Sequence, residues 1–450
     1  MEKRASPPSS APNSAAGLVS RYGFSHIVTT LDQLGFSRCR FWIFREHLSC
    51  HTISVGRHLY PSPEPCYKPN IELPKPLSAS KTPASFPVPA HEQQDTVFAP
   101  AFELIRQAIA DRAFPTASVA ITHRGNLVGL KAFGHFTYEP DSPEAITGSV
   151  FDLASLTKVV ATTSMAMILY ERGLLDLDLP VTAVVAEFAA EDPRRDAVTM
   201  RMLLAHSSGL PAYEKLFLRA KTRDELLSAA FATPLSANPG AKAEYSDVGF
   251  IILGAALERI AEESLDRFCQ HEVFGPLAMT HTAFNPPLAW RASIPPTAND
   301  YSFRHRIIQG EVQDENASVM GGVAPHAGLF AGAADLAVFA HAILAGGRPI
   351  LRPETLAVFT RRESSPTGTS RALGWDTPSS PSQSGKYFSA NSFGHLGYTG
   401  TSLWIDPTRQ LSVTLLTNRT WPDCSNQAIK QLRPKIHDAV VESLERPTHT

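Results

Sequence analysis

Ser155 and Lys158 are the residues of this sequence whose types and spacing most directly suggest covalent chemistry. They stand three residues apart in FDLASLTKVVATTSMAMILYERG, residues 151–173, at the head of an otherwise apolar run. Side chains three residues apart share one face of a helix, so Ser155 Oγ and Lys158 Nζ can meet. The helix dipole and apolar surroundings would lower the pKa of Lys158, and a neutral lysine can take a proton from serine.

The S-x-x-K spacing also has a purely structural interpretation. Ser155 could cap a helix, and Lys158 could extend to solvent. The same spacing recurs from Ser78 to Lys81, in a proline-rich stretch that cannot form a helix. The helix expected from Ala154 to just before Gly173 favours the downstream copy, because its free N-terminal N–H groups could stabilise an oxyanion.

Tyr245 and Asp247 immediately precede a second amphipathic run, in AEYSDVGFIILGAALERIAEES. In the structural interpretation Ser246 or Asp247 is an N-cap and Tyr245 is a hydrophobic staple. In the functional interpretation both side chains face the serine from a loop. A tyrosine phenol sharing a network with Lys158 can carry the serine proton to a leaving group.

A third candidate is the His395-Leu396-Gly397 triplet on an expected C-terminal strand. The small residues that follow it would let a ligand backbone lie against the strand edge. The H-x-G pattern recurs at 123–125 and 326–328. Those copies are interpreted as structural, the first in a hairpin and the second in a loop before a helix at about 334–345.

The elements that must position these residues run in the order strands, helices, strands. A helix is expected from about Thr96, followed by a hairpin around residues 124–126. A second hairpin is expected to turn at residues 406–410, and a last helix to be broken or kinked near Pro434. The order predicts an α+β (mixed α/β) fold, in which both ends of the chain build one antiparallel sheet flanked by helices, with a helical lobe.

The chain divides at a proline-rich stretch. Residues 61–90 hold nine prolines and no helical period, so residues 61–95 are interpreted as a linker. Residues 1–60 form an unassigned N-terminal arm, which could be a small appendage, a disordered segment or sequence translated upstream of the true start. The catalytic domain is expected over residues 96–440, followed by a tail at residues 441–450.

Composition excludes several classes of function. A formal charge of -2 gives no indication of nucleic acid or anionic membrane as a partner. Glycine-rich nucleotide loops, HExxH and CxxC are absent from the sequence. Neither a signal peptide nor a transmembrane helix is expected from the sequence, and the five scattered cysteines favour free thiols in a reducing compartment. A cytoplasmic location is therefore the expectation; the oligomeric state stays open.

The three motifs together resemble the serine hydrolases of the β-lactamase and penicillin-binding-protein superfamily. The closest likeness is to the class C-like branch, which includes family VIII carboxylesterases, D-aminopeptidases and DD-peptidase-like proteins. The order of the motifs agrees, and so do three connecting phrases: LLAHSSGLP, GGVAPHAGLFAGAADLAVFA and GYTGTSLWIDP. The resemblance covers about residues 96–440. A nucleophile elbow G-x-S-x-G is absent at Ser155, which excludes an α/β-hydrolase there.

The resemblance implies a role for each candidate residue. Ser155 is the nucleophile, Lys158 its base or proton relay, and Tyr245 the partner acid and base. His395 and Gly397 mark the strand that closes the site, and the backbone N–H groups of Ser155 and Tyr398 form the oxyanion hole. The implied fold is an antiparallel sheet with a helical lobe, without cofactor or metal.

Two departures from the superfamily pattern indicate the substrate class. Asp247 occupies the asparagine position of Tyr-x-Asn, and His395 occupies the lysine position of Lys-Thr-Gly. Both changes remove contacts that anionic amide substrates use, which favours a carboxylesterase acting on short-chain esters. The alternatives are a β-lactamase, a D-Ala-D-Ala carboxypeptidase or D-aminopeptidase, and a penicillin-binding or sensing module without turnover. In each case the partner is a small ester or amide.

Overall fold

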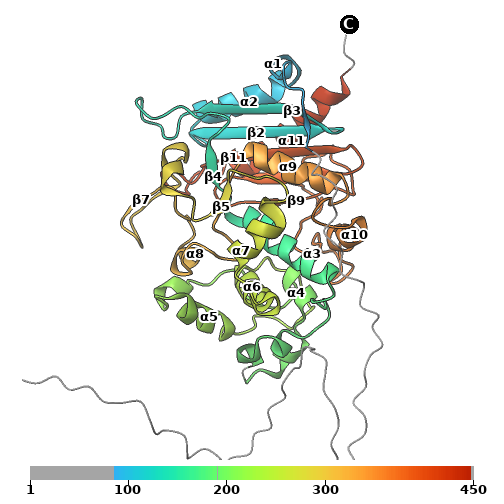
Figure 1. Cartoon of the computed structure of the whole chain (residues 1–450). Helices are drawn as coiled ribbons and strands as arrows, with labels where there is room; N and C mark the ends of the chain where they lie inside the picture. The colour runs from blue at the N-terminus through green and yellow to red at the C-terminus, as the bar shows by residue number, and fades with distance from the viewer. Residues whose placement is uncertain (1–85, 190, 447–450) are drawn as a thin grey trace, which may run out of the picture. The chain divides into compact units, whose positions relative to one another are not determined.

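The computed structural model describes residues 86–189 and 191–446, all within the compact unit Ile71–Thr450. Its main element is a six-stranded sheet in the order β1-β3-β2-β11-β10-β9 (Figure 1). The strands are β1 (Val88–Pro89), β2 (Thr116–His123), β3 (Asn126–Gly134), β9 (Phe393–Leu396), β10 (Ser402–Asp406) and β11 (Leu411–Thr417). The Ser78 copy of the S-x-x-K motif, the N-terminal arm and most of the tail lie outside the described residues.

Strands from both ends of the chain form the centre of this sheet. β2 and β3 pair as a hairpin, and Arg124 and Gly125 at its turn both have positive φ, as a two-residue type I′ turn requires. β10 and β11 form the second predicted hairpin, and β11 pairs antiparallel with β2. The predicted α+β fold, with one antiparallel sheet built from both chain ends, is confirmed.

The sheet begins within the stretch interpreted as a linker. β1 pairs in parallel with β3 at the sheet edge, where the Val88 N–H donates to Gly125 O at 3.0 Å and the Ala90 N–H to Leu127 O at 2.9 Å. The prolines at 87 and 89 alternate with these donors, so their missing N–H groups fall on the side away from β3. The last residues of the expected linker therefore belong to the sheet.

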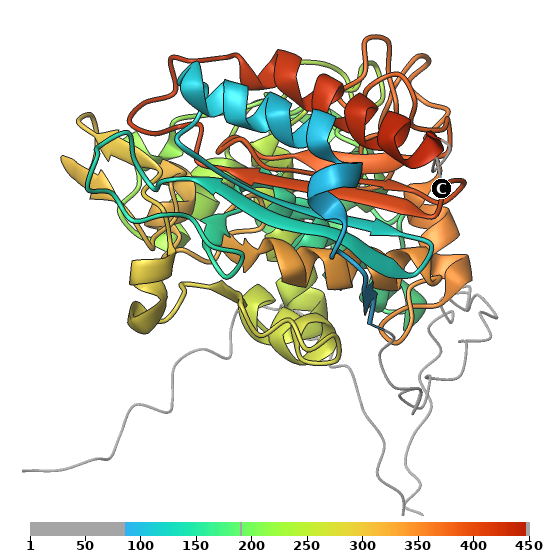
Figure 2. The same ribbon diagram turned by 90° about the horizontal axis from the view of Figure 1, so that it is seen from above.

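Helices cover both faces of the sheet (Figure 2). One face is covered by α2 (Ala99–Ala110) and α11 (Ile429–Glu445), which also contact each other, and the other by α9 (Ala333–Leu344). Side chains alternate between two apolar cores, as the strand period requires: Val119 and Ile121 pack with α2 and α11, whereas Ala120 belongs to the core on the other side.

The middle of the chain forms the helical lobe. Its helices are α3 (Ser164–Glu171), α4 (Met200–Leu204), α5 (Arg223–Phe231), α6 (Asp247–Ala261), α7 (Leu265–Cys269), α8 (Glu315–Val319) and α10 (Pro353–Thr360), and α1 (Gln94–Val97) precedes α2. The lobe also holds strands that the sequence interpretation missed. β4 (Val150–Asp152), β8 (Leu329–Gly332) and β5 (Thr282–Phe284) form one small sheet, and β6 (Ala298–Asp300) and β7 (Arg306–Ile308) form another. Three-residue strands carry too little alternation to be detected.

The expected break at Pro434 is wrong, because α11 runs through this residue. Proline removes the N–H that would bond to the carbonyl of Lys430. That carbonyl instead accepts a hydrogen bond from the Gln383 side chain at 3.0 Å. A donor from outside the helix thus satisfies the group that proline leaves unpaired.

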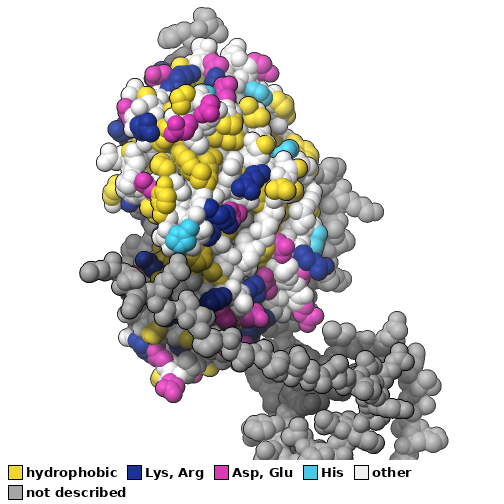
Figure 3. All heavy atoms as spheres, turned by 90° about the vertical axis from the view of Figure 1, so that its left-hand side faces the viewer, with side chains coloured by type: hydrophobic (Ala, Val, Ile, Leu, Met, Phe, Trp, Pro, Cys, Tyr) yellow, Lys and Arg dark blue, Asp and Glu magenta, His cyan; other side chains and the backbone are white. Residues whose placement is uncertain are grey.

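On the face that Figure 3 shows, acidic and basic side chains of the described residues are intermingled, and neither charge dominates. Within residues 86–189 and 191–446, no helix has both the length and the apolar character needed to cross a membrane.

Candidate active site

Ser155 lies in a tight turn directly after β4. The turn is a 3-10 segment, Ala154–Leu156, followed by a π-helical segment, Lys158–Thr163, before α3 begins at Ser164. The helix expected from Ala154 therefore starts where it was predicted, but its first ten residues are mostly 3-10 and π-helical and the regular α-helix begins at Ser164. Ala154 has φ 47°, and its N–H donates to Asp152 Oδ1 at 2.8 Å. This left-handed residue turns the chain sharply between strand and helix.

Lys158 is fully buried beneath Ser155 and contacts three oxygen atoms. Its Nζ lies 3.2 Å from Ser155 Oγ, 2.6 Å from Asp247 Oδ1 and 3.0 Å from the His326 carbonyl oxygen. Burial lowers the pKa of Lys158, and the Asp247 carboxylate acts in the opposite direction. The alternative in which Lys158 extends to solvent is excluded, because its side chain is 0% exposed.

Tyr245 and Asp247 reach the serine from the start of α6. The Tyr245 hydroxyl donates to Ser155 Oγ at 2.7 Å. The N-cap of α6 is Ser246, whose Oγ accepts from the Gly249 N–H at 2.9 Å, and this leaves the Asp247 carboxylate free to pair with Lys158. Burial raises the pKa of Tyr245 well above its usual value, so the resting side chain is a neutral phenol.

The hydrogen atoms in this network can be counted. A neutral lysine has two N–H donors and one lone pair, and Lys158 faces two pure acceptors, the Asp247 carboxylate and the His326 carbonyl. Its lone pair is then directed at the Ser155 hydroxyl, while Tyr245 donates to the same oxygen. A protonated lysine would instead donate to all three oxygen atoms, and the Tyr245 hydroxyl would then donate to Asp247 and accept the Ser155 proton. With a neutral lysine, the geometry suits proton removal from Ser155 by Lys158.

The end of β9 closes the site from the other side. His395 is buried, and its Nδ1 donates to the Leu396 carbonyl at 2.8 Å. Burial lowers the pKa of His395 well below its usual value, with further lowering from Lys158 and Arg371, so the ring is neutral near pH 7. Gly397 is needed for close approach, because a Cβ there would lie 1.9 Å from Thr401 Oγ1.

Two backbone N–H groups are available to an oxyanion. The Gly397 N–H donates to Thr401 O and the Gly400 N–H to Gly397 O. For the N–H groups of Ser155 and Tyr398, no acceptor is found among the described residues. Unpaired donors of this kind are what an oxyanion hole requires.

A cavity of about 690 Å³ opens onto these groups. Its lining includes every site residue suggested by the sequence except Lys158, which lies beneath it: Ser155, Tyr245, Asp247, His395, Gly397 and Tyr398. The lining also carries charged side chains of both signs: Lys215, Arg371, Arg419, Lys430, Arg433, Asp314, Glu315 and Asp376. The structure thus brings the three motifs together around one cavity that also contains cations not anticipated from the sequence.

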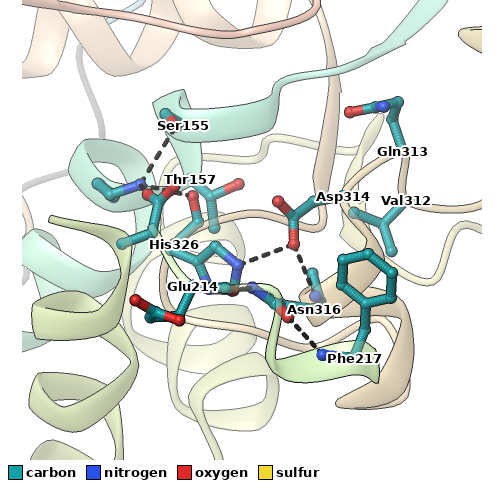
Figure 4. Close-up of polar contacts among 12 residues, drawn as sticks. Ser155, Thr157, Glu214, Phe217, Val312, Gln313, Asp314, Asn316 and His326 are labelled. Atoms are coloured by element: carbon teal, nitrogen blue, oxygen red, sulfur yellow. Dashed lines mark hydrogen bonds and ion pairs between the residues drawn. The ribbon is translucent and has the colours of Figure 1, made fainter. Parts of the chain in front are cut away.

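His326 was interpreted as structural, but it lines the cavity. Its carbonyl holds Lys158, and its Nε2 lies 2.9 Å from Asp314 Oδ1 (Figure 4). Asp314 in turn accepts from the Ala317 N–H as the N-cap of α8. Burial acts to raise the pKa of Asp314, but the facing His326 and these hydrogen bonds outweigh it and the pKa is lowered. The remaining H-x-G copy, at His123, lies at the β2–β3 turn and does not line the cavity.

His206, in the phrase LLAHSSGLP, is a second residue to which the sequence analysis assigned no role. Its Nδ1 accepts from the Ser246 N–H at 3.0 Å and its carbonyl from the Glu244 N–H at 2.8 Å. These bonds hold the chain on both sides of Tyr245, whose ring centroid lies 4.7 Å from the imidazole. The conspicuous phrase around His206 was the only signal for it in the sequence.

Among the described residues, no group of three or more His, Cys, Asp or Glu side chains is arranged to hold a metal ion. The described cysteines, buried Cys269 and exposed Cys424, are free. The other three cysteines lie outside the described residues.

The site places Ser155 above the buried Lys158, at a cavity that strand β9 and the start of helix α6 also line. A model of the family described as Beta-lactamase matches residues 101–433. The chain belongs to the beta-lactamase family, and it has the mixed α+β fold of the beta-lactamase/transpeptidase type.

Two curated relatives are similar over most of the chain. A putative D-alanyl-D-alanine carboxypeptidase of Escherichia coli (strain K12) is 31% identical over 346 residues, covering 69% of this chain and 79% of that protein. An N-acetylmuramyl-L-alanine amidase of Bacillus subtilis (strain 168) is 31% identical over 355 residues, covering 70% of this chain and 80% of that protein. These homologues support an enzyme of the beta-lactamase family.

Two solved structures show the same fold. EstCE1, described as a hydrolase with promiscuous acyltransferase activity, superposes with a TM-score of 0.64 at 21% identity, covering 77% of this chain and 99% of that chain. A penicillin-binding protein homologue from Caulobacter crescentus gives a TM-score of 0.63 at 21% identity, covering 77% and 97%. At this level of identity the likeness concerns the fold alone.

Proposed function

We propose that this chain is a serine hydrolase that works through an acyl-enzyme on Ser155. The observation that carries the proposal is the placement of Ser155 Oγ between the Lys158 amine at 3.2 Å and the Tyr245 hydroxyl at 2.7 Å. Lys158 is the base, Tyr245 the proton donor to the leaving group, and Asp247 the counter-ion of the lysine after it gains the proton.

The reaction proceeds in two balanced halves. Ser155 Oγ bonds to the substrate carbonyl carbon, its proton passes to Lys158 Nζ, and the carbonyl π pair moves onto oxygen, facing the N–H groups of Ser155 and Tyr398. The oxyanion collapses, the bond to the leaving group breaks, and Tyr245 gives that group a proton, which the network restores from Lys158. A water molecule then attacks the acyl-enzyme by the same steps and releases the acid and Ser155.

For the substrate class we propose carboxylesterase activity on short-chain esters. Neutral His395 supplies no cation at the position where related enzymes carry lysine, and its Nδ1–H is already bonded to the Leu396 carbonyl. Asp247 is engaged with Lys158, and a carboxylate has no proton to donate to an acylamido carbonyl. An ester needs only the Ser155, Lys158 and Tyr245 network and expels an alkoxide more easily than an amide expels an amine.

A second candidate is cleavage of an amide substrate that bears a carboxylate, as a D-Ala-D-Ala carboxypeptidase, D-aminopeptidase or β-lactamase would perform. Arg371 favours it, since its guanidinium lies 5.5 Å from the Tyr245 ring centroid and lines the cavity. Its ion pair with Asp376, at 3.7 Å, is long. Arg371 thus supplies the cation that the sequence argument found lacking. The names of the Escherichia coli and Bacillus subtilis relatives point the same way.

One set of rates separates these candidates. We would measure kcat/KM for p-nitrophenyl butyrate, nitrocefin and a D-Ala-D-Ala peptide on the same preparation at pH 7. The carboxylesterase proposal predicts the highest value for the ester and weak or absent hydrolysis of nitrocefin. A value for nitrocefin or the peptide at or above that for the ester would replace it with the second candidate. Covalent labelling without turnover of any substrate would identify a binding or sensing module.

A further inference from the structure

Arg433 is a buried cation of α11 that the proposed mechanism does not use. Its side chain is buried, at 4% exposure, and lines the cavity behind the end of β9. Its Nη2 donates to the Gly397 carbonyl at 3.0 Å and to the Thr401 carbonyl at 3.1 Å. The Gly397 N–H also donates to Thr401 O, at 2.8 Å. The guanidinium therefore joins both sides of the loop that carries Tyr398.

This cation has no acidic partner. Neither Arg433 nor its neighbour Arg419 forms an ion pair with any residue that the structure describes, and Arg433 Nε has no hydrogen-bond partner there. Burial, with a smaller effect from Arg419, lowers the pKa of Arg433 to about 9, so it stays charged at neutral pH. An uncompensated buried charge costs folding free energy. A buried, unpaired arginine beside the active site is therefore not explained by folding stability.

The reason lies in the peptide group that Arg433 contacts. The Gly397 carbonyl and the Tyr398 N–H belong to the same peptide unit, and this N–H has no acceptor among the described residues. A cation on the carbonyl oxygen draws electron density from the amide and makes its N–H a stronger donor. It also fixes the plane of the peptide. Arg419 repeats the arrangement one residue further on, where its Nε donates to the Tyr398 carbonyl at 2.7 Å.

We propose that Arg433 is a positioning residue that polarises the Gly397–Tyr398 peptide, so that the Tyr398 N–H stabilises the oxyanion more strongly. The proposal rests on the hydrolase function proposed above. The stabilisation that the polarised Tyr398 N–H provides grows with the negative charge on the substrate oxygen. Arg433 should therefore stabilise the tetrahedral intermediate and have little effect on the bound ester. Losing a whole oxyanion-hole donor costs roughly 10²–10³-fold in kcat. Losing only its polarisation should cost less, about ten- to a hundredfold.

The test compares Arg433→Met with a matched arginine elsewhere. Arg195 is also buried and donates to the backbone carbonyls of Phe188, Phe231 and Thr233, none of which lines the cavity. Arg195→Met therefore reports the loss of a buried arginine bonded to carbonyls, without any effect on the oxyanion. Three readouts are taken: kcat and KM for p-nitrophenyl butyrate and for an ester that bears a carboxylate, the inhibition constant of phenylboronic acid, which forms a tetrahedral adduct with a reactive serine, and the melting temperature.

Arg433→Met is expected to lower kcat and phenylboronic acid affinity by similar factors, with KM within about threefold of wild type. Arg433→Lys should recover part of both losses, and Arg195→Met should lower only the melting temperature. If Arg433→Met does not fold, Arg433→Gln, which keeps one donor without the charge, is judged by the same criteria.

Two results would overturn the proposal. One is a loss in kcat and boronic acid affinity no larger than in Arg195→Met. The other is a rise in KM at unchanged kcat, confined to substrates with a carboxylate, which would make Arg433 a substrate-binding residue. Failure of the hydrolase function itself would look different, because wild-type protein would then form no adduct at Ser155.

Discussion

Replacing Lys158 and Tyr245, singly and together, tests whether they act as one proton relay. Both side chains contact Ser155 Oγ, at 3.2 and 2.7 Å. In the proposed relay, the serine proton reaches the leaving group only when both are present. A positioned acid–base group contributes roughly 10²–10⁴-fold, so Lys158→Met and Tyr245→Phe should each lose about a thousandfold in kcat. At 1.36 kcal/mol per factor of ten, each loss is about 4 kcal/mol in activation free energy.

Independent contributions would sum to about 8 kcal/mol in the double variant, whereas a relay broken at either step leaves the loss near 4 kcal/mol. The assay is kcat for p-nitrophenyl butyrate, from initial rates of p-nitrophenol release at saturating substrate. Lys158→Met leaves the Asp247 carboxylate without its counter-ion, so Lys158→Met/Asp247→Asn serves as the matched variant, and melting temperatures report folding. A double variant slower than wild type by the full product of the two single losses would refute the relay.

Three further outcomes follow from the structure. Because the proposed reaction needs neutral Lys158 and burial lowers its pKa, kcat/KM should rise as pH increases through that lowered pKa. Asp247→Asn removes the carboxylate that raises the pKa of Lys158, so the rise in kcat/KM should occur at lower pH in this variant. A rise at higher pH than in wild type would contradict the assignment of Lys158 as the base. Gly397→Ala places a Cβ 2.5 Å from a backbone oxygen and should reduce both activity and melting temperature, whereas Gly148→Ala, whose nearest neighbour is 3.8 Å away, should change neither in the same two measurements. Deleting residues 1–85 should leave the melting temperature and ester hydrolysis nearly unchanged, and extending the deletion through β1 should lower the melting temperature; an inactive shorter deletion would show that the arm supports the active site.

The sequence predicted the sheet and the catalytic motifs for physical reasons that are local. Hairpins such as β2–β3 show strand alternation and turn residues within a few positions. Ser155 and Tyr245 each stand at the start of an apolar helical run, which is visible as a change in composition, whereas His395 lies near the end of β9. The three-residue strands and the 3-10 and π-helical start of the serine helix were missed, because such segments are too short to show a period.

The remaining site residues are fixed by contacts across long distances in the chain. His326 contributes a backbone carbonyl to Lys158, 168 residues away, and a carbonyl leaves no trace in the residue type. Arg371 and Arg433 come from a loop and a helix without any motif, and their approach to the cavity depends on the packing of the whole domain. The motif positions alone predicted a site without a cation, whereas both arginines line the cavity.

The central claim is that Ser155 becomes acylated. The most direct measurement is the intact mass of the protein after brief incubation with p-nitrophenyl acetate at pH 7 and rapid quenching in acid, followed by peptide mapping of the adduct. The account predicts one acetyl group on the peptide containing Ser155, and none on Ser155→Ala treated in parallel. An acetyl group on Ser78 or on another residue, or an adduct that persists in Ser155→Ala, would contradict it.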